Sequence, residues 1–289
     1  MPGTGAYGTA GGPALSVGPV SLGPMPPAKK RPRAYDHLRT RTAVLAQFGH
    51  VRDTVRALTP DQLARPTRLD GWTVRDLVAH IALGLGAVSR DLALPEPPGP
   101  KPATTLLEWA PAVAAAVRDA TAPPPSAGHP DLLALYGEVE AGFLADVPAS
   151  GTGDRLLTTR VGSMRLADVL VTRTVELTVH TDDLNEALGL EIPYDRQALA
   201  ACTRLLADTL ADRAPGGSVE VRVPPFAVVQ CIGGPKHTRG TPPNVVETGP
   251  LTWARLATGR TEWARALADA EVSASGERAD LAGLLPLLA

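Results

Sequence analysis

The segment Asp70–His80, DGWTVRDLVAH, contains the signals that begin a helix, and it ends on a histidine. Thr73 suits the N-cap position, and Asp76 three residues later completes a capping box, in which each residue satisfies a backbone N–H group of the other. Apolar residues then recur at helical spacing as far as Val88. The pattern predicts a helix with one apolar face and with His80 at the flank of that face.

The neighbours of His80 decide how it is interpreted. Trp72 and Leu77 occupy the positions of a hydrophobic staple, which fixes how the chain enters the helix. Gly84 and Ala87 follow His80 on the same side of the helix, and their small size leaves room for a group larger than a side chain. A histidine in such a place is more often a hydrogen-bonded core residue, so a functional interpretation requires a partner elsewhere in the chain.

The composition of the 289 residues limits the class of protein. The formal net charge is −2, which gives no electrostatic reason to expect a nucleic-acid partner. The two cysteines, Cys202 and Cys231, form no CxxC pair, so we expect both to be structural and the protein to reside in a reducing cytoplasm. The chain has no run of about 18 apolar residues, which argues against a membrane span. The oligomeric state stays open.

The rhythm of the sequence divides it into three parts. Residues 1–34 contain seven Gly and seven Pro and end in KKRPR, which predicts a disordered tail; Met25 within it is an alternative start. Residues 35–190 have helical periodicity, broken by one hairpin-like stretch, and predict a helical bundle. Residues 191–289 alternate helical segments with strand-like ones such as SVEVRVP, FAVVQCI and NVVET, and predict an α+β domain.

The last helical segment of the bundle offers a partner for His80. In VELTVHTDD, a spacing of four places Glu176 and His180 on one helical face, and Arg173 and Asp183 share that face. Because burying unpaired charge is costly, either pairing with Arg173 or a metal ion must compensate. A glutamate and a histidine four residues apart are usually only a solvated pair. Helical bundles, however, build metal sites from such groups, and two histidines with one glutamate match open catalytic zinc sites.

The two motifs together carry a resemblance to a known family. LDGWTVRDLVAHI, followed by RTVELTVHTDDL, resembles the mycothiol-dependent maleylpyruvate isomerase family, one of the DinB-like metal-binding bundles, over about residues 35–188. The resemblance implies that His80, Glu176 and His180 are metal ligands. TGPLTWARLATGR and EVSASGERADLAGLLPLL resemble a small sterol-carrier-like domain. The fold class expected is therefore a two-domain protein: an all-α DinB-like four-helix bundle followed by an α+β sterol-carrier-like domain.

The resemblance also implies a role for Arg260. That family requires a C-terminal arginine near the metal, and LATGR places Arg260 at the matching position. We expect it to face the metal across a cleft and grip a substrate carboxylate, so that Arg260→Lys lowers turnover with metal content intact. The alternative is a surface arginine at a helix C-terminus. Asp183 is expected either to orient His180 or to serve as a cap or partner of Arg173.

The resemblance implies an enzyme that binds a divalent metal and uses mycothiol as thiol cosubstrate; the ligand types favour zinc and leave nickel and iron open. Since neither cysteine belongs to the motifs, the thiolate comes from outside the chain, and the reaction expected is isomerisation of, or thiol transfer to, a small electrophilic substrate. The alternative is a binding protein whose sterol-carrier-like domain holds an apolar ligand, with a structural metal site.

The loop CIGGPKHTRGTPPN, with Lys236, His237 and Arg239, is either a lid or anion contact or a solvated connection.

Overall fold

A computed structural model describes residues 3–5, 33–118, 125–234 and 243–288. It separates Met1–Ala34 from one compact unit, Tyr35–Ala289. The predicted disorder of the tail and the alternative start at Met25 concern residues that lie almost entirely outside the described ranges. The same holds for Lys236, His237 and Arg239 of the Gly/Pro-rich loop.

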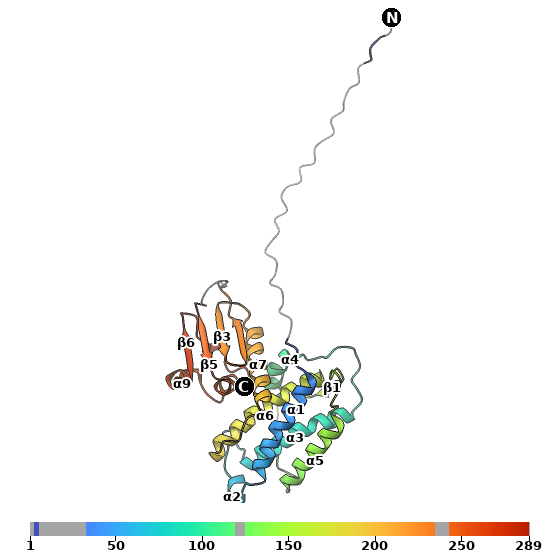
Figure 1. The fold of residues 1–289 in the computed structure, drawn as a ribbon, viewed down its shortest axis with the longest axis vertical. Coiled ribbons are helices and arrows are strands. Elements are labelled where there is room, and N and C mark those ends of the chain that lie inside the picture. The colour runs from blue at the N-terminus through green and yellow to red at the C-terminus, as the bar shows by residue number, and fades with distance from the viewer. Residues whose placement is uncertain (1–2, 6–32, 119–124, 235–242, 289) are drawn as a thin grey trace. The chain divides into compact units, whose positions relative to one another are not determined.

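Helices make up most of the first two thirds of the compact unit, and the last third contains a sheet together with helices (Figure 1). The helices are α1 (His37–Val55), α2 (Pro60–Leu63), α3 (Val74–Ala93), α4 (Leu106–Arg118), α5 (Leu132–Asp146), α6 (Leu166–Leu188), α7 (Arg196–Arg213), α8 (Pro250–Ala257) and α9 (Trp263–Ala268). The strands are β1 (Leu156–Thr159), β2 (Gly162–Arg165), β3 (Val219–Val223), β4 (Ala227–Cys231), β5 (Val245–Thr248) and β6 (Val272–Ser275). A short 3₁₀ turn, Ala282–Leu284, follows β6.

The bundle is formed by α1, α3, α5 and α6, which pack against one another around an apolar core (Figure 1). Helix α3 begins as its sequence predicts, with both hydrogen bonds of the capping box between Thr73 and Asp76 in place. The expected hairpin is the antiparallel pair β1–β2, directly before α6. Helix α6 ends at Gly189, whose left-handed backbone (φ 67°) is the usual way for glycine to close a helix.

The α+β part is built on a sheet of order β4-β3-β5-β6, in which β3 and β5 are parallel and the other neighbours antiparallel. Helix α7 packs against β4 on one side and against α1 and α6 on the other, so it joins the sheet to the bundle. Trp253 of α8 is completely buried. One hydrophobic cluster extends from Val44 of the bundle to Leu287 near the C-terminus, so the two parts share a continuous core.

Helix α6 lies at the centre of this arrangement, in contact with α1, α3 and α7. Unusually for a central helix, it buries six polar side chains: Thr172, Thr174, Thr178, Thr181, Asp182 and Asp183. The threonines are able to bond to carbonyls of their own helix, but buried carboxylates need cationic or N–H partners from elsewhere. The partners of α6 therefore determine where a polar site forms.

The architecture confirms the predicted fold class, a helical bundle followed by an α+β part. The local signals were sufficient for this because caps, periodicity and strand composition agree along the chain. None of the described helices combines the length and the apolar character needed to cross a membrane.

Candidate metal centre

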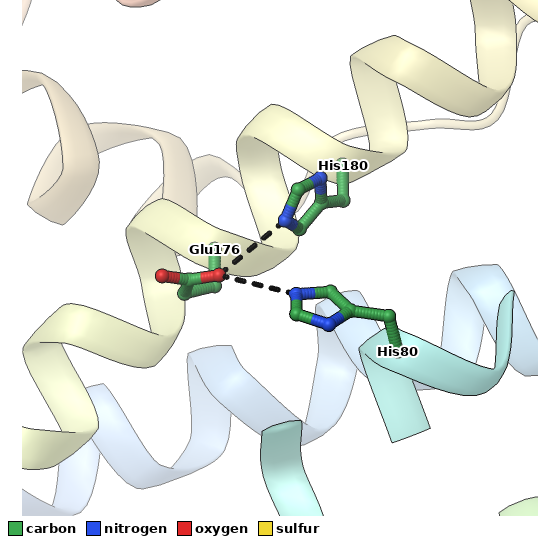
Figure 2. Close-up of side chains that lie close together, drawn as sticks. All are labelled: His80, Glu176 and His180. Atoms are coloured by element: carbon green, nitrogen blue, oxygen red, sulfur yellow. Dashed lines mark ion pairs between the residues drawn. The ribbon is translucent and has the colours of Figure 1, made fainter. Parts of the chain in front are cut away.

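His80, Glu176 and His180 come together between α3 and α6 (Figure 2). One potential ligand atom from each lies within 4.8 Å of the other two. The Oε2 atom of Glu176 is 3.8 Å from Nε2 of His80 and 3.4 Å from Nε2 of His180. Helix α6 supplies two of the residues one turn apart, and α3 supplies the third from the facing side.

This donor set fits a divalent metal ion. Ligand atoms at about 2.0–2.2 Å from a tetrahedral ion lie roughly 3.3–3.6 Å apart, and the two distances to Glu176 Oε2 are at or slightly above that range. The chemistry of the donors points the same way. A neutral His180 Nε2 and the Glu176 carboxylate both present lone pairs, so they repel each other unless a proton or a cation lies between them.

His80 is held on α3 mainly by aromatic neighbours. The Trp72 ring meets the His80 ring edge-on, with 4.9 Å between ring centroids, and the His180 ring lies perpendicular to His80 at 5.0 Å. Trp72 stands directly before the capping box that begins α3, so one local motif sets both the start of the helix and the orientation of this imidazole. His80 remains about one-third exposed.

His180 is held by charge. Its Nδ1–H donates to Oδ2 of Asp183 at 2.9 Å, which leaves Nε2 turned toward Glu176. Asp183 lies less than one turn further along α6 and is completely buried. A carboxylate on the second nitrogen is the usual way to fix the tautomer and the direction of a metal-binding imidazole. Of the two roles expected for Asp183, the geometry favours orienting His180, and no ion pair joins Asp183 to Arg173 among the described residues.

The electrostatics of the three groups are coupled. Burial alone would raise the pKa of Glu176, but the contacts with His180 and His80, together with the nearby Arg173 charge, hold it well below its ordinary value. Burial lowers the pKa of His80. For His180, burial acts in the same direction, but Asp183 and Glu176 outweigh it and raise the pKa. The site thus keeps one anion between two imidazoles, as a cation-binding site requires.

A small cavity opens beside the three groups and is lined by them. Its other walls are apolar or small, except for one guanidinium: the remaining lining residues are Ile81, Gly84, Leu85, Leu177 and Arg173. Arg173 Nη1 approaches the Gly84 carbonyl at 3.4 Å, and its Nε and Nη2 contact the Thr172 hydroxyl. No carboxylate lies within ion-pair distance of Arg173 in the described part of the chain. The cavity therefore combines three potential metal ligands with a guanidinium that forms no ion pair in the described part of the chain.

Arg260 does not line this cavity. Its Nε and Nη2 donate to the two oxygens of Asp183, at 3.2 and 3.0 Å, and its Nη1 donates to the Thr258 carbonyl at 2.8 Å. The arginine is therefore close to the three groups, but its fork is directed at the carboxylate behind His180. A role for Arg260 in catalysis stays a prediction.

The structure adds residues that the sequence analysis did not single out. Arg255 binds the carboxylate of Asp182 through Nε and Nη2, and Tyr194 donates its hydroxyl to the same carboxylate. Arg68, two residues before DGW, contacts both Asp182 and Asp183. The only local signal was the pair of adjacent aspartates in HTDD, which gave no indication of partners 12, 73 and 114 residues away from Asp182.

Comparisons with known proteins agree with the motifs. Residues 44–185 match the family model described as the mycothiol maleylpyruvate isomerase N-terminal domain, and residues 195–287 match the model described as the bacterial SCP ortholog. No curated protein matches the chain in sequence. These two matches define the class: an isomerase-type helical bundle joined to an SCP-type α+β domain. The chain thus combines a domain of the mycothiol maleylpyruvate isomerase N-terminal type with a C-terminal domain of the SCP type.

Two solved structures share the fold. One is the mycothiol-dependent maleylpyruvate isomerase, with a TM-score of 0.52 and 16% identity over 85% of this chain and 95% of that chain. The other is a histidine-to-alanine mutant of this isomerase, with a TM-score of 0.54 and the same identity and coverage. At this identity the likeness concerns the fold alone, so the chemistry has to be argued from the residues of this chain.

Proposed function

We propose that this protein is a mycothiol-dependent metalloenzyme that isomerises, or transfers the thiol to, a small electrophilic substrate. The observation that carries the proposal is the convergence of His80, Glu176 and His180 beside a cavity that also contains Arg173. The family match over residues 44–185 supports the choice of mycothiol.

In this proposal His80, Glu176 and His180 hold a divalent metal ion. Zinc suits two imidazoles and one carboxylate best, although nickel and iron accept the same donors. With three protein ligands, such an ion retains an open position, acts as a Lewis acid and keeps a bound thiol in its thiolate form at neutral pH. Trp72 and Asp183 hold the two imidazoles in the orientation that this requires.

The protein's own cysteines are poor candidates for the nucleophile. Cys202 and Cys231 are both free and buried. Burial raises the pKa of the Cys202 thiol to about 12 and that of the Cys231 thiol to about 11, so neither is a thiolate near neutral pH. An external thiol has to supply the nucleophile, which favours a thiol cosubstrate. Two free thiols also suit the reducing cytoplasm.

The walls of the cavity indicate the class of electrophile. Ile81, Leu85 and Leu177 exclude water from one side, while Arg173 offers N–H donors and a positive charge. A small molecule that carries a carboxylate on an otherwise apolar, unsaturated skeleton matches both features. Arg173 is therefore the side chain that we assign to the substrate carboxylate. This assignment leaves Arg260 for a separate role.

The proposal is tested by the metal content of the purified protein and by its thermal stability with and without mycothiol. We expect about one equivalent of zinc, and a higher melting temperature with mycothiol because a ligand that binds only the folded state stabilises it. Glu176→Gln should abolish both, whereas Glu138→Gln, at an exposed position of α5, should change neither. Full metal content in the Glu176 variant would contradict the proposed site.

A further inference from the structure

Two buried aspartates at the end of α6 bind two arginines of the C-terminal part in the same way. Arg255 Nη2 lies 2.7 Å from Asp182 Oδ1, and Arg260 Nη2 lies 3.0 Å from Asp183 Oδ2. Each arginine also uses its Nε on the same carboxylate, so both pairs are forked. The side chains of Asp182 and Asp183 are only 3% and 0% exposed, which makes these pairs internal to the protein.

The end of α8 places the two arginines side by side. Gly259 adopts a left-handed backbone (φ 71°), and the N–H of Arg260 returns to the carbonyl of Arg255 at 2.8 Å. The N–H of Gly259 meets the Leu256 carbonyl, so the helix ends in a Schellman motif. This turn brings Arg260 back beside Arg255, although five positions separate them. The segment RLATGR, residues 255–260, thus presents two guanidinium groups to two adjacent carboxylates.

The two pairs differ in the other groups that each carboxylate contacts. Asp182 is bonded to the Tyr194 hydroxyl at 3.2 Å, which is a structural contact. Asp183 instead accepts from Nδ1 of His180, whose other nitrogen faces Glu176. A direct path of contacts therefore runs from Arg260 through Asp183 to His180. The Arg255 pair is linked to Asp183 only indirectly, through Arg68, among the described residues.

Buried ion pairs are an inefficient way to attach one part of a protein to another. The desolvation of both charges offsets most of their attraction, and the shared apolar core already joins the two parts. What a forked, buried pair supplies is a fixed direction, because the planar guanidinium constrains both carboxylate oxygens. That direction is useful at Asp183, where the carboxylate orients an imidazole.

We propose that the C-terminal part of the chain sets the position of His180 through Arg260 and Asp183, and so tunes the affinity of the site for its metal ion. This inference rests on the proposed function. It makes Arg260 a positioning residue that acts on the metal centre from behind a ligand. It also makes the C-terminal part a component of the metal centre, because the bundle alone would leave Asp183 with Arg68 as its only cationic partner among the described residues.

The test compares Arg260→Gln with Arg255→Gln in the full-length protein. Each variant removes one forked pair from the same helix end, so a purely structural role predicts the same result for both. Zinc affinity is measured by competition with a chelator. The absorption spectrum of the Co²⁺-substituted protein reports the geometry of the metal ligands, and thermal melting reports stability. We expect Arg260→Gln to weaken zinc binding about 10-fold, which is the low end of the range for groups that support a metal ligand without binding the metal. The same variant should shift the Co²⁺ absorption bands. Arg255→Gln should lower only the melting temperature.

A double variant sharpens the comparison. If Arg260 acts through Asp183, then Arg260→Gln should have no further effect on zinc affinity in an Asp183→Asn background. Arg260→Lys is equally informative and covers the case in which the neutral variants fail to fold, with Arg255→Lys as its control. A lysine lacks the fork, so the inference predicts weaker metal binding, whereas an arginine that only grips substrate predicts lower turnover with unchanged metal affinity.

The outcomes distinguish a failure of the positioning role of Arg260 from a failure of the proposed function. Equal zinc affinity in the Arg260 and Arg255 variants, with a functional wild-type site, would overturn the positioning role and leave the proposed function standing. A wild-type protein that binds neither Zn²⁺ nor Co²⁺ would overturn the proposed function, and the positioning role would fall with it. The inference is supported if Arg260→Gln weakens zinc binding, Arg255→Gln does not, and Arg260→Gln has no further effect in the Asp183→Asn background.

Discussion

The two histidines of the candidate metal centre are held in different ways. His80, on α3, is oriented by the edge of Trp72 and is 34% exposed. His180, on α6, is oriented by a buried carboxylate that Arg260 and Arg68 neutralise, and it is 12% exposed. One imidazole thus depends on a motif within ten residues of itself, and the other depends on parts of the chain far away in sequence.

The difference has an energetic consequence. An aromatic edge contact is weak and local, so its loss affects one side chain. Removing one member of a buried charged network leaves the others uncompensated, so its loss affects both stability and geometry. Substitutions on the His180 side should therefore have larger effects than those on the His80 side.

The largest effect is expected for Asp183→Ala. The substitution leaves Arg260 without its buried counter-ion, takes one of two buried carboxylates from Arg68 and removes the acceptor of His180. We expect a loss of about 3–5 kcal/mol in the free energy of unfolding and a 10- to 100-fold weaker affinity for zinc. Denaturant unfolding and chelator competition measure the two quantities.

Asp182→Ala is the matched control for Asp183→Ala. Asp182 is equally buried and binds Arg255, but it does not contact His180. It should lose stability to a similar degree and keep its zinc affinity within about threefold, since it has no direct contact with a ligand. An equal loss of zinc affinity in both variants would show that the contact between Asp183 and His180 has no special effect on the metal site.

Arg173→Gln should have the second largest effect, and it should appear in catalysis alone. Arg173 lines the cavity but contacts none of the proposed ligands directly, so metal content should stay intact. Loss of a positioned contact to a substrate carboxylate typically lowers turnover about 10²-fold. Steady-state kinetics with carboxylate-bearing electrophiles and mycothiol test this, with Arg265→Gln, at an exposed arginine, as control. Unchanged kinetics would remove Arg173 from the substrate site.

The sequence predicted the fold and the helix that carries His80 because their determinants are local. The capping box, the periodicity of α3 and the glycine at the end of α6 are each readable within a few residues. The spacing of Glu176 and His180 on one face was readable for the same reason, whereas their meeting with His80 was implied only by the resemblance. The partners of Asp182 and Asp183 were not readable, since a buried aspartate looks like an exposed one until the fold places arginines beside it.

Gly259→Ala should have an intermediate effect that probes how Arg260 is presented. The left-handed backbone at this position disfavours any side chain, and the substitution should lower the free energy of unfolding by about 1–2 kcal/mol. Because this turn positions Arg260 against Asp183, the substitution should displace Arg260, and we also expect weaker zinc binding. Gly137→Ala, within α5 and free of neighbours at the new methyl position, should instead raise stability slightly. Equal behaviour of the two variants would contradict a strained turn at Gly259.

The smallest effect is expected for Trp72→Leu, on the His80 side. An edge-on aromatic contact contributes about 0.5–1.5 kcal/mol beyond the area it buries, so its loss should weaken zinc affinity only about two- to tenfold. Trp72→Phe keeps an aromatic edge beside the imidazole and should behave more like the wild type. The Nε2 atom of His80 lies 3.8 Å from Glu176 Oε2, beyond hydrogen-bond distance, so this contact does not replace the aromatic one and some loss is expected. If Trp72→Leu instead weakens zinc binding more than Asp183→Ala, then the exposed ligand, and not the buried one, controls the site. The contrast between a locally held histidine and one held through the C-terminal part would then be reversed.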